Sequence, residues 1–366
     1  MKVRIAGVGA AVPEAVIPTA KLLSIFPGPR KKPWTADEFV AKTGIRERRF
    51  SVDLDENSGM PIFPPGYGVA PGPAGTLAEE AIREALDSAG LDPGDLDALI
   101  FGSNTPDTLH FGTDAQHLHY RLGMRPDASA LHVDLGCGGS VFALQWAKEM
   151  ILSGARRHVA VVLTQVVSPL LNRLTYAGSL DYGGNDNEAF LTALLFGDGA
   201  GAAILTRTDD DSESELVSAV TLNEYFEIAV QRAGGNLRPP GFPGLNPSDF
   251  AVHIIGKRVA DAYAPVLERV IGQALSEAGM GTGDIAKFYL HQSNRRLIEQ
   301  LADDLGAEGA RVPINVDRYG NTSGASVLIL LAEEVRAGAV ALGSGEPVVI
   351  AAVGANLQYG AHVVRL

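Results

Sequence analysis

The sequence contains a single cysteine, Cys137, among its 366 residues. One thiol excludes a disulfide within the chain and a cysteine-based zinc site, and it fits a reducing compartment. Basic residues are also few, 30 against 43 acidic ones, so the formal net charge is −13. Such a chain is poorly suited to nucleic acid, because phosphate binding needs a basic surface.

Long apolar runs are absent as well. None approaches the roughly 20 residues that span a bilayer, and the first residues show no signal-peptide cleavage pattern. We therefore expect a soluble, cytoplasmic protein that engages neither membrane nor nucleic acid and holds no metal. Apolar residues make up 46% of the chain, which at this length predicts about two domain-sized units.

An internal repeat organises these units. Residues 85–102 (ALDSAGLDPGDLDALIFG) and 274–291 (ALSEAGMGTGDIAKFYLH) are identical at six of 18 positions without a gap. Each predicts an amphipathic helix, a Gly-Asp turn and an apolar strand. A second pair, starting at Val133 and Val316, predicts a turn, a helix that begins with small residues, and a buried strand. Two matches in the same order indicate one α/β unit present twice.

Two irregular stretches interrupt the repeat. We place the first half at residues 1–205, a connecting segment at 206–252 and the second half at 253–366. The connecting segment holds an acidic run and a stretch rich in turn residues. Within the first half, residues 51–75 contain an insertion in which nine of the fifteen residues from Pro61 to Gly75 are proline or glycine. We expect a loop there, either a lid or a passive insertion.

Cys137 lies in a glycine-rich turn where a predicted strand ends and a helix begins. A lone cysteine is commonly a small buried hydrophobe. A helix N-terminus would instead lower the pKa of the thiol, and the glycines would let a substrate carbonyl approach the backbone N–H groups. The residues alone leave both interpretations open.

His291 and Asn321 occupy the corresponding turns of the second half. His291 could be a buried structural side chain and Asn321 a helix N-cap. Equivalent turns of a duplicated fold face each other, however, so we expect Cys137 and Asn321 to converge on one pocket. A thiolate can hold an acyl group, while a histidine and an asparagine can stabilise the enolate oxygen formed by decarboxylation.

The glycines of residues 197–201 do not predict a nucleotide site. A phosphate-binding glycine loop follows a strand and opens a helix. Here the glycines run into Ala202-Ala203-Ile204-Leu205, which predicts a strand.

Four motifs together resemble the thiolase superfamily, and within it the β-ketoacyl-acyl-carrier-protein synthase III-like condensing enzymes. They are Thr-Gly-Ile-Arg-Glu-Arg at 43–48, Phe-Gly-Asp-Gly-Ala-Gly-Ala at 196–202, His-Gln-Ser-Asn at 291–294 and Gly-Asn-Thr-Ser at 320–323. The resemblance implies an α/β fold of five layers, αβαβα, built from two pseudo-symmetric halves, and a homodimer. It makes Cys137 the acylated nucleophile, with His291 and Asn321 promoting decarboxylation of a malonyl-type extender. The backbone N–H groups of Cys137 and Ala355 would form the oxyanion hole, with Asn356 tolerating a positive φ in place of glycine.

The resemblance also implies a substrate tunnel. Phe39 and Lys42 stand where the family commonly has a tryptophan and an arginine that hold coenzyme A, so an acyl carrier protein gains weight as the donor. Phe111 would reach into the acyl pocket of a partner subunit, or would be a core aromatic. Gly256 and Asn294 would contact substrate. The residues expected at a carrier-protein docking surface, unless they are ordinary solvated charges, are Lys257, Arg258, Arg295 and Arg296.

Three functions remain open. The first is decarboxylative Claisen condensation in polyketide or specialised fatty-acid biosynthesis, with acyl-coenzyme A or acyl-carrier-protein thioesters as substrates and no permanently bound cofactor. The second is acyl transfer to a hydroxyl, amine or thiol without C–C bond formation. The third is a catalytically silent subunit of a heterodimer.

Overall fold

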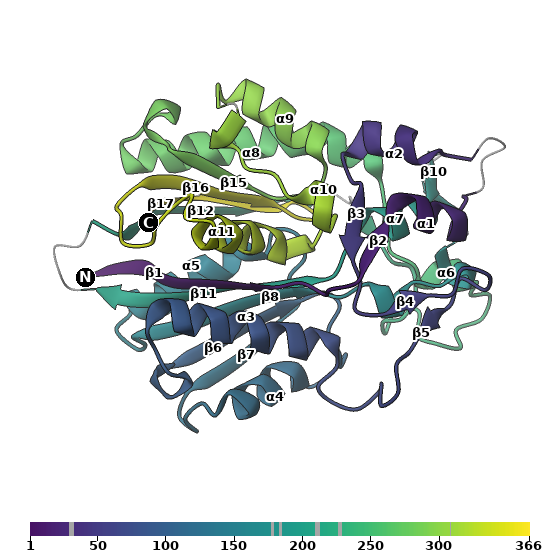
Figure 1. The fold of residues 1–366 in the computed structure, drawn as a ribbon, viewed down its shortest axis with the longest axis horizontal. Helices are drawn as coiled ribbons and strands as arrows, with labels where there is room; N and C mark the ends of the chain where they lie inside the picture. The colour runs from purple at the N-terminus through teal and green to yellow at the C-terminus, as the bar shows by residue number, and fades with distance from the viewer. Residues whose placement is uncertain (29–32, 177–178, 183–184, 209–212, 226–228, 308) are drawn as a thin grey trace.

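Two β-sheets and three layers of helices form the core of the molecule (Figure 1). The computed structural model describes the chain except residues 29–32, 177–178, 183–184, 209–212, 226–228 and 308. The first sheet has the strand order β1 (Lys2–Ala11), β11 (Gly199–Thr208), β8 (His158–Gln165), β6 (Ala98–Ser103), β7 (Ser129–Val133). The second has the order β12 (Glu215–Asn223), β17 (Gln358–Arg365), β16 (Pro347–Val353), β15 (Lys287–Leu290).

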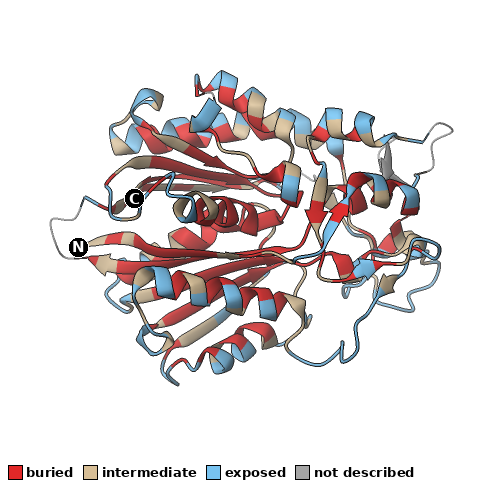
Figure 2. Cartoon of the chain, in the orientation of Figure 1, coloured by how far each residue is buried: buried red, intermediate tan, exposed pale blue. Residues whose placement is uncertain are grey.

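Helices separate and cover the two sheets. The layers are α3 (Pro73–Ala89) and α4 (Thr113–Leu122) outside the first sheet, α5 (Gly139–Leu152) and α11 (Ser326–Arg336) between the sheets, and α8 (Gly256–Ala278) and α9 (Arg295–Asp304) outside the second. Most residues of the two central helices are buried (Figure 2), because both helices lie between the two sheets and pack against each of them. The predicted five-layered αβαβα fold is confirmed.

The two halves follow the same plan. In both, a long outer helix ends at a left-handed glycine, Gly90 (φ 65°) or Gly279 (φ 66°), and a single 3-10 turn leads into a parallel strand. The strand order of the first four strands in one sheet matches that of the other. Within the described residues, β7 has no counterpart in the second sheet, so the first half alone carries this extra edge strand.

Smaller elements gather at the end of the sheets that Figure 1 shows on the right. They are β2 (Val16–Pro18), α1 (Thr19–Ile25), α2 (Ala36–Thr43), β3 (Glu47–Arg49), β4 (Asp53–Leu54), β5 (Pro61–Ile62), α6 (Arg173–Tyr176), β9 (Ser179–Tyr182), β10 (Asn185–Glu188), α7 (Ala189–Leu195), β13 (Ala229–Val230), β14 (His253–Ile254) and α10 (Val316–Tyr319).

Two boundaries differ from the prediction. The segment 206–252, expected to connect the halves, contains the end of β11 and all of β12, the edge strand of the second sheet. Part of the acidic run that suggested a linker, residues 209–212, lies outside the described residues. The insertion at 51–75 is not wholly irregular either, because β4 pairs with β5 and α3 begins at Pro73. A proline suits the first helical position, because the N–H that proline lacks would have no hydrogen-bond partner within the helix there.

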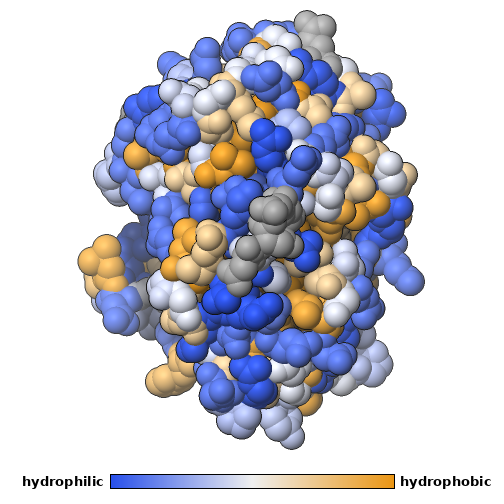
Figure 3. Space-filling view, turned by 90° about the vertical axis from the view of Figure 1, so that its left-hand side faces the viewer, coloured by the Kyte–Doolittle hydropathy of each residue, from blue (hydrophilic) through white to orange (hydrophobic). Residues whose placement is uncertain are grey.

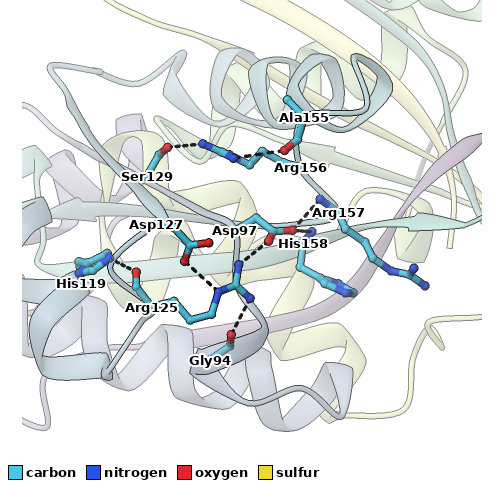
Figure 4. Close-up of polar contacts among 10 residues, drawn as sticks. All are labelled: Gly94, Asp97, His119, Arg125, Asp127, Ser129, Ala155, Arg156, Arg157 and His158. Atoms are coloured by element: carbon cyan, nitrogen blue, oxygen red, sulfur yellow. Dashed lines mark hydrogen bonds and ion pairs between the residues drawn. The ribbon is translucent and has the colours of Figure 1, made fainter.

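A polar network fixes the opposite end of the first sheet (Figure 4). The carboxylate of Asp97, which precedes β6, accepts hydrogen bonds from the backbone N–H of Arg157 at 2.7 Å and of His158 at 3.0 Å, and from Nη2 of Arg125 at 2.7 Å. The starts of β6 and β8 are thereby tied together. On the face at this end, apolar residues are scattered in small groups among hydrophilic ones (Figure 3).

Candidate active site

The turns that carry Cys137 and Asn321 meet between the two halves. A Cβ at Gly324 would lie 2.8 Å from the carbonyl oxygen of Gly136, so the two backbones are in contact only because residue 324 is glycine. The hydroxyl of Ser323 donates a hydrogen bond to the sulfur of Cys137 at 3.5 Å. The expected convergence of the two turns is therefore present in the fold.

A cavity of about 180 Å³ opens above the Cys137 thiol. Its walls are mostly apolar, and the polar side chains beside the thiol include His291, Asn321 and Asn294. The other lining residues are Leu195, Phe196, Ile254, Gly256, Val259, Ala260, Ala262, Tyr263, Ser293, Leu297, Val353, Gly354 and Ala355. A mostly apolar cavity with a few convergent polar groups is typical of a small-molecule site.

Burial raises the pKa of the Cys137 thiol, and hydrogen bonds from Ser323 and Asn321 oppose this rise only in part. The prediction that a helix N-terminus lowers this pKa is wrong in direction. The thiol stands two residues before α5, which begins at Gly139, rather than in its first turn. Removal from water therefore disfavours the thiolate, and the resting thiol is protonated.

His291 is neutral in this site. Burial lowers its pKa to about 3. Its Nδ1 lies 2.9 Å from Oγ of Ser326, and that oxygen accepts the backbone N–H of Gln292 at 3.2 Å. The Ser326 O–H has no other acceptor among the described hydrogen bonds, so we assign it as the donor to Nδ1, which places the ring proton on Nε2. The ring nitrogen not bonded to Ser326 is thus a hydrogen-bond donor.

Asn321 is held by both its backbone and its side chain. Its N–H donates to the carbonyl of Leu195 at 2.9 Å, and its carbonyl accepts the N–H of Gly197 at 3.1 Å. Its Oδ1 accepts the N–H of Ser323 at 2.8 Å. With Oδ1 engaged in this way, Nδ2 is left to donate. Asn321 is not the N-cap of α11, where Ala325 stands.

The loop after β16 reaches the cavity at Gly354 and Ala355. It turns sharply, since the N–H of Gly354 donates to the carbonyl of Gln358 at 2.7 Å. Asn356 has a positive φ of 59°, as predicted. Leu357 also has one, 54°, which the sequence did not indicate.

Comparisons with known proteins agree with this geometry. The family model for 3-oxoacyl-[acyl-carrier-protein (ACP)] synthase III matches residues 131–223, and the model for its C-terminal part matches 275–366. A β-ketoacyl-[acyl-carrier-protein] synthase III of Roseiflexus sp. (strain RS-1) is 33% identical over 98% of this chain and 97% of its own length. The chain belongs to the β-ketoacyl-acyl-carrier-protein synthase III family.

Solved structures extend this result. The synthase III of Aquifex aeolicus VF5 matches with a TM-score of 0.78 and 26% identity, covering all of both chains. The priming β-ketosynthase of the R1128 polyketide pathway matches with a TM-score of 0.74 and 26% identity, covering 100% of this chain and 96% of the other. The thiolase-like fold is thereby shown, and the chain is an enzyme of the synthase III type.

In this synthase III-like enzyme, two helix N-termini border the cavity. Gly256 begins α8 and Asn294 caps α9, its Oδ1 accepting the N–H of Arg296 at 2.9 Å. The basic residues predicted for docking stand in these first turns: Lys257, Arg258, Arg295 and Arg296. Arg295 is partly neutralised, because its Nε donates to Glu299 at 2.7 Å.

Phe39 does not lie at the cavity mouth. It is 1% exposed and packs edge-on against Trp34, with the ring centroids 6.4 Å apart. A buried ring has no face free for an adenine, so Phe39 does not take the place of the tryptophan that holds coenzyme A in the family. Lys42 is exposed and its Nζ lies 4.5 Å from the Trp34 ring centroid. Trp34 was not singled out in the sequence analysis. The chain has only two tryptophans, and the position of this one eight residues before Lys42 could have indicated their contact.

Phe111 is 99% exposed and has a φ of 65°. It is therefore not a core aromatic within one chain. The loop that carries it lies beside β7, since a Cβ at Gly112 would be 3.4 Å from Cβ of His132.

The insertion lines a different cavity. Residues 67–73 border a space of about 300 Å³ together with Asp107, His117 and Leu170. Among the described residues, none from 51–75 lines the Cys137 cavity. The position of this loop therefore gives no support to a lid over Cys137.

Two further searches covered the described part of the chain. It contains no helix that is both long and apolar enough to cross a membrane. It also contains no group of three or more His, Cys, Asp or Glu side chains placed to hold a metal ion.

Proposed function

We propose that Cys137 carries an acyl group as a thioester and that His291 and Asn321 drive the decarboxylation of a malonyl-type extender, giving a decarboxylative Claisen condensation. The observation that carries this proposal is the meeting of one thiol, one neutral histidine and one fixed asparagine in a single cavity. The proposed setting is polyketide or specialised fatty-acid biosynthesis in the cytoplasm. Similarity to the R1128 priming ketosynthase supports that pathway class, and the lone thiol suits a reducing compartment.

The first half-reaction is acyl transfer to sulfur. The Cys137 thiol attacks the carbonyl of the donor thioester, and its proton leaves with the departing thiol. The negative charge that develops on the carbonyl oxygen needs donors, which the backbone N–H groups of Cys137 and Ala355 supply in this proposal.

The second half-reaction begins with loss of carbon dioxide from the extender. The electrons of the broken C–C bond form an enolate, whose oxygen accepts hydrogen bonds from Nε2–H of His291 and Nδ2–H of Asn321. A neutral histidine suits this role, because an imidazolium would be costly in a mostly apolar cavity. The enolate carbon then attacks the acyl-Cys137 carbonyl, forms the new C–C bond and releases the thiolate.

The donor is proposed to be an acyl carrier protein, with coenzyme A thioesters as the alternative. Four cations on two helix N-termini beside the cavity give a local positive surface on a chain of net charge −13. An acidic carrier would be steered to this surface. Gly256 and Asn294 would then contact the pantetheine arm, and Lys42 with Trp34 would border the entrance.

The enzyme is proposed to be a homodimer joined along β7. This strand is the edge of the first sheet and pairs only with β6 among the described strands. Leu109 and Phe111 are 79% and 99% exposed beside it, an arrangement that favours burial against a second copy. Phe111 would then enter the partner's acyl pocket. Sedimentation should give a dimer at micromolar concentration, and a monomer would contradict this.

Intact-protein mass spectrometry tests the catalytic proposal. The chain is exposed to a panel of acyl thioesters on coenzyme A and on carrier protein, with Cys137→Ala as the matched variant. The wild type should gain one acyl mass and the variant none. If both the wild type and Cys137→Ala gained acyl mass, Cys137 would not be the residue that carries the acyl group. No gain from any donor would favour the silent subunit.

A malonyl thioester is then added to the acylated enzyme. A β-keto product with loss of carbon dioxide is expected. Carbon dioxide release at the wild-type rate with no new C–C bond would favour acyl transfer to another acceptor.

A further inference from the structure

Ser323 contacts two of the proposed catalytic residues, Cys137 and Asn321, but has no role in the mechanism described above. It is 1% exposed. Its backbone N–H donates to Oδ1 of Asn321 at 2.8 Å, and its hydroxyl donates to the sulfur of Cys137 at 3.5 Å. One residue of the second half thus contacts the reacting atom of the first half, across 186 positions of sequence.

The backbone at Ser323 is strained. Its φ is 52°, in the left-handed region that favours glycine. Strained conformations of this kind persist where the surroundings enforce them, and they cluster at active sites. A glycine at 323 would adopt this conformation freely, but it would bring no hydroxyl to the sulfur. Serine at this position thus combines the left-handed backbone with a hydroxyl that contacts the Cys137 sulfur, which glycine could not provide.

The buried sulfur of Cys137 needs a hydrogen-bond donor if it is to become a thiolate. Burial disfavours the thiolate, because the anion loses its hydration. Within the described hydrogen bonds, Ser323 supplies the hydroxyl that contacts the sulfur. A hydrogen bond to an anion is about twice as strong as one between neutral groups, so this contact strengthens as the S–H proton leaves.

We infer that Ser323 is a further catalytic residue, whose hydroxyl stabilises the Cys137 thiolate during acyl transfer while its N–H holds the Asn321 amide for decarboxylation. The inference rests on the proposed function, in which Cys137 is the nucleophile. In the step concerned, the bond from the acyl carbon to the donor sulfur breaks and a bond to the Cys137 sulfur forms. The Cys137 proton goes to the departing thiol, and the Ser323 proton stays on its oxygen.

The test measures the rate of Cys137 alkylation by iodoacetamide as a function of pH. Because the chain has one cysteine, the mass of the product reports this thiol alone. Ser323→Ala should shift the profile to higher pH and slow alkylation at pH 7 by about tenfold, the effect of losing one hydrogen bond to a charged group. Ser323→Gly, which also relieves the left-handed strain, should show the same loss.

Ser140→Ala is the matched control. Ser140 is a buried serine three positions from Cys137, and its hydroxyl has no hydrogen-bond partner among the described residues. This variant should keep the wild-type profile. A wild-type profile in Ser323→Ala would overturn the inference, as would full recovery in Ser323→Gly, because strain rather than the hydroxyl would then be responsible.

Half-reactions give a second readout. Ser323→Ala keeps the N–H that holds Asn321, so carbon dioxide release by the acylated enzyme should stay within about twofold of wild type while acylation slows. An equal loss of both would indicate a merely structural role and overturn the inference. Failure of the proposed function would look different, since the wild type itself would then take up no acyl group.

Discussion

The hydroxyl of Ser326 lies 2.9 Å from Nδ1 of His291, where donation of its O–H keeps the ring proton on Nε2. The serine belongs to the central helix α11, whereas the histidine directly follows β15 of the second sheet. Helix packing and ring tautomer are therefore connected. A shift of α11 would leave His291 neutral but would free the ring to place its proton on the wrong nitrogen.

Replacing Ser326 should impair only one half-reaction. In Ser326→Ala the tautomer is no longer fixed, so carbon dioxide release from a malonyl thioester should fall by about tenfold, the usual worth of one well-placed hydrogen bond. Acylation of Cys137, followed by intact mass, should be unchanged. A variant that loses both activities equally would show that Ser326 supports the fold rather than the tautomer.

Asn321→Ala should separate the half-reactions more strongly. Removal of one oxyanion donor costs roughly 10²- to 10³-fold in rate, so decarboxylation should fall by that factor while Cys137 still takes up an acyl group. Radiolabelled carbon dioxide and intact mass measure the two steps independently. If acylation fell by the same factor, Asn321 would instead serve the first oxyanion.

A charge reversal at Arg296 should discriminate between donors. Its Nε donates to the carbonyl of Ala41 at 3.0 Å, which holds the start of α9 against α2 beside the entrance. Arg296→Glu should raise KM for an acyl carrier protein by about tenfold, because the reversed charge repels an acidic partner. Coenzyme A is an anion too, so an equal rise in KM for the matching coenzyme A thioester would show that Arg296 binds the coenzyme rather than the carrier. Arg157→Glu is the control, since it makes the same charge change on an exposed residue at the opposite end of the first sheet.

Acid should destabilise the protein through His362. This residue is fully buried in β17 and its Nε2 donates to the carbonyl of Val141 in α5 at 2.7 Å. Burial lowers its pKa to about 4, so the unfolded chain binds more protons than the folded one between about pH 6.5 and pH 4. The free energy of unfolding should therefore fall as the pH drops through this range, by up to about 1.4 kcal/mol per pH unit for this group.

Urea unfolding at a series of pH values measures this slope. In His362→Gln it should be shallower, with the remaining slope due in part to His291, whose pKa is lowered to about 3. An equal slope in His362→Gln and the wild type would contradict the assignment.

The fold and the central catalytic residues were accessible from the sequence because both repeat a local pattern. The two helix–turn–strand units match over residues 85–102 and 274–291, and such short-range patterns do not depend on the rest of the chain. The same repeat predicted that Cys137 and Asn321 would meet.

Features set by tertiary packing were not accessible. Phe39 illustrates this, since one residue along a helix turns a side chain by about 100°, and a motif match cannot tell the buried face of α2 from the exposed one. Ser323 and Ser326 acquire their partners only when the two halves pack together. The direction of the pKa shift at Cys137 depends on the depth of the cavity, which no local pattern encodes.

The contact between Gly324 and Gly136 limits how this enzyme can be redesigned. With no room for a methyl group between the two turns, any attempt to widen the substrate range by mutating the turns would push the halves apart and separate the catalytic groups. The side chains of Val259, Ala262 and Leu297 line the cavity from α8 and α9 instead. Engineering of the accepted acyl donor should therefore begin on those two helices.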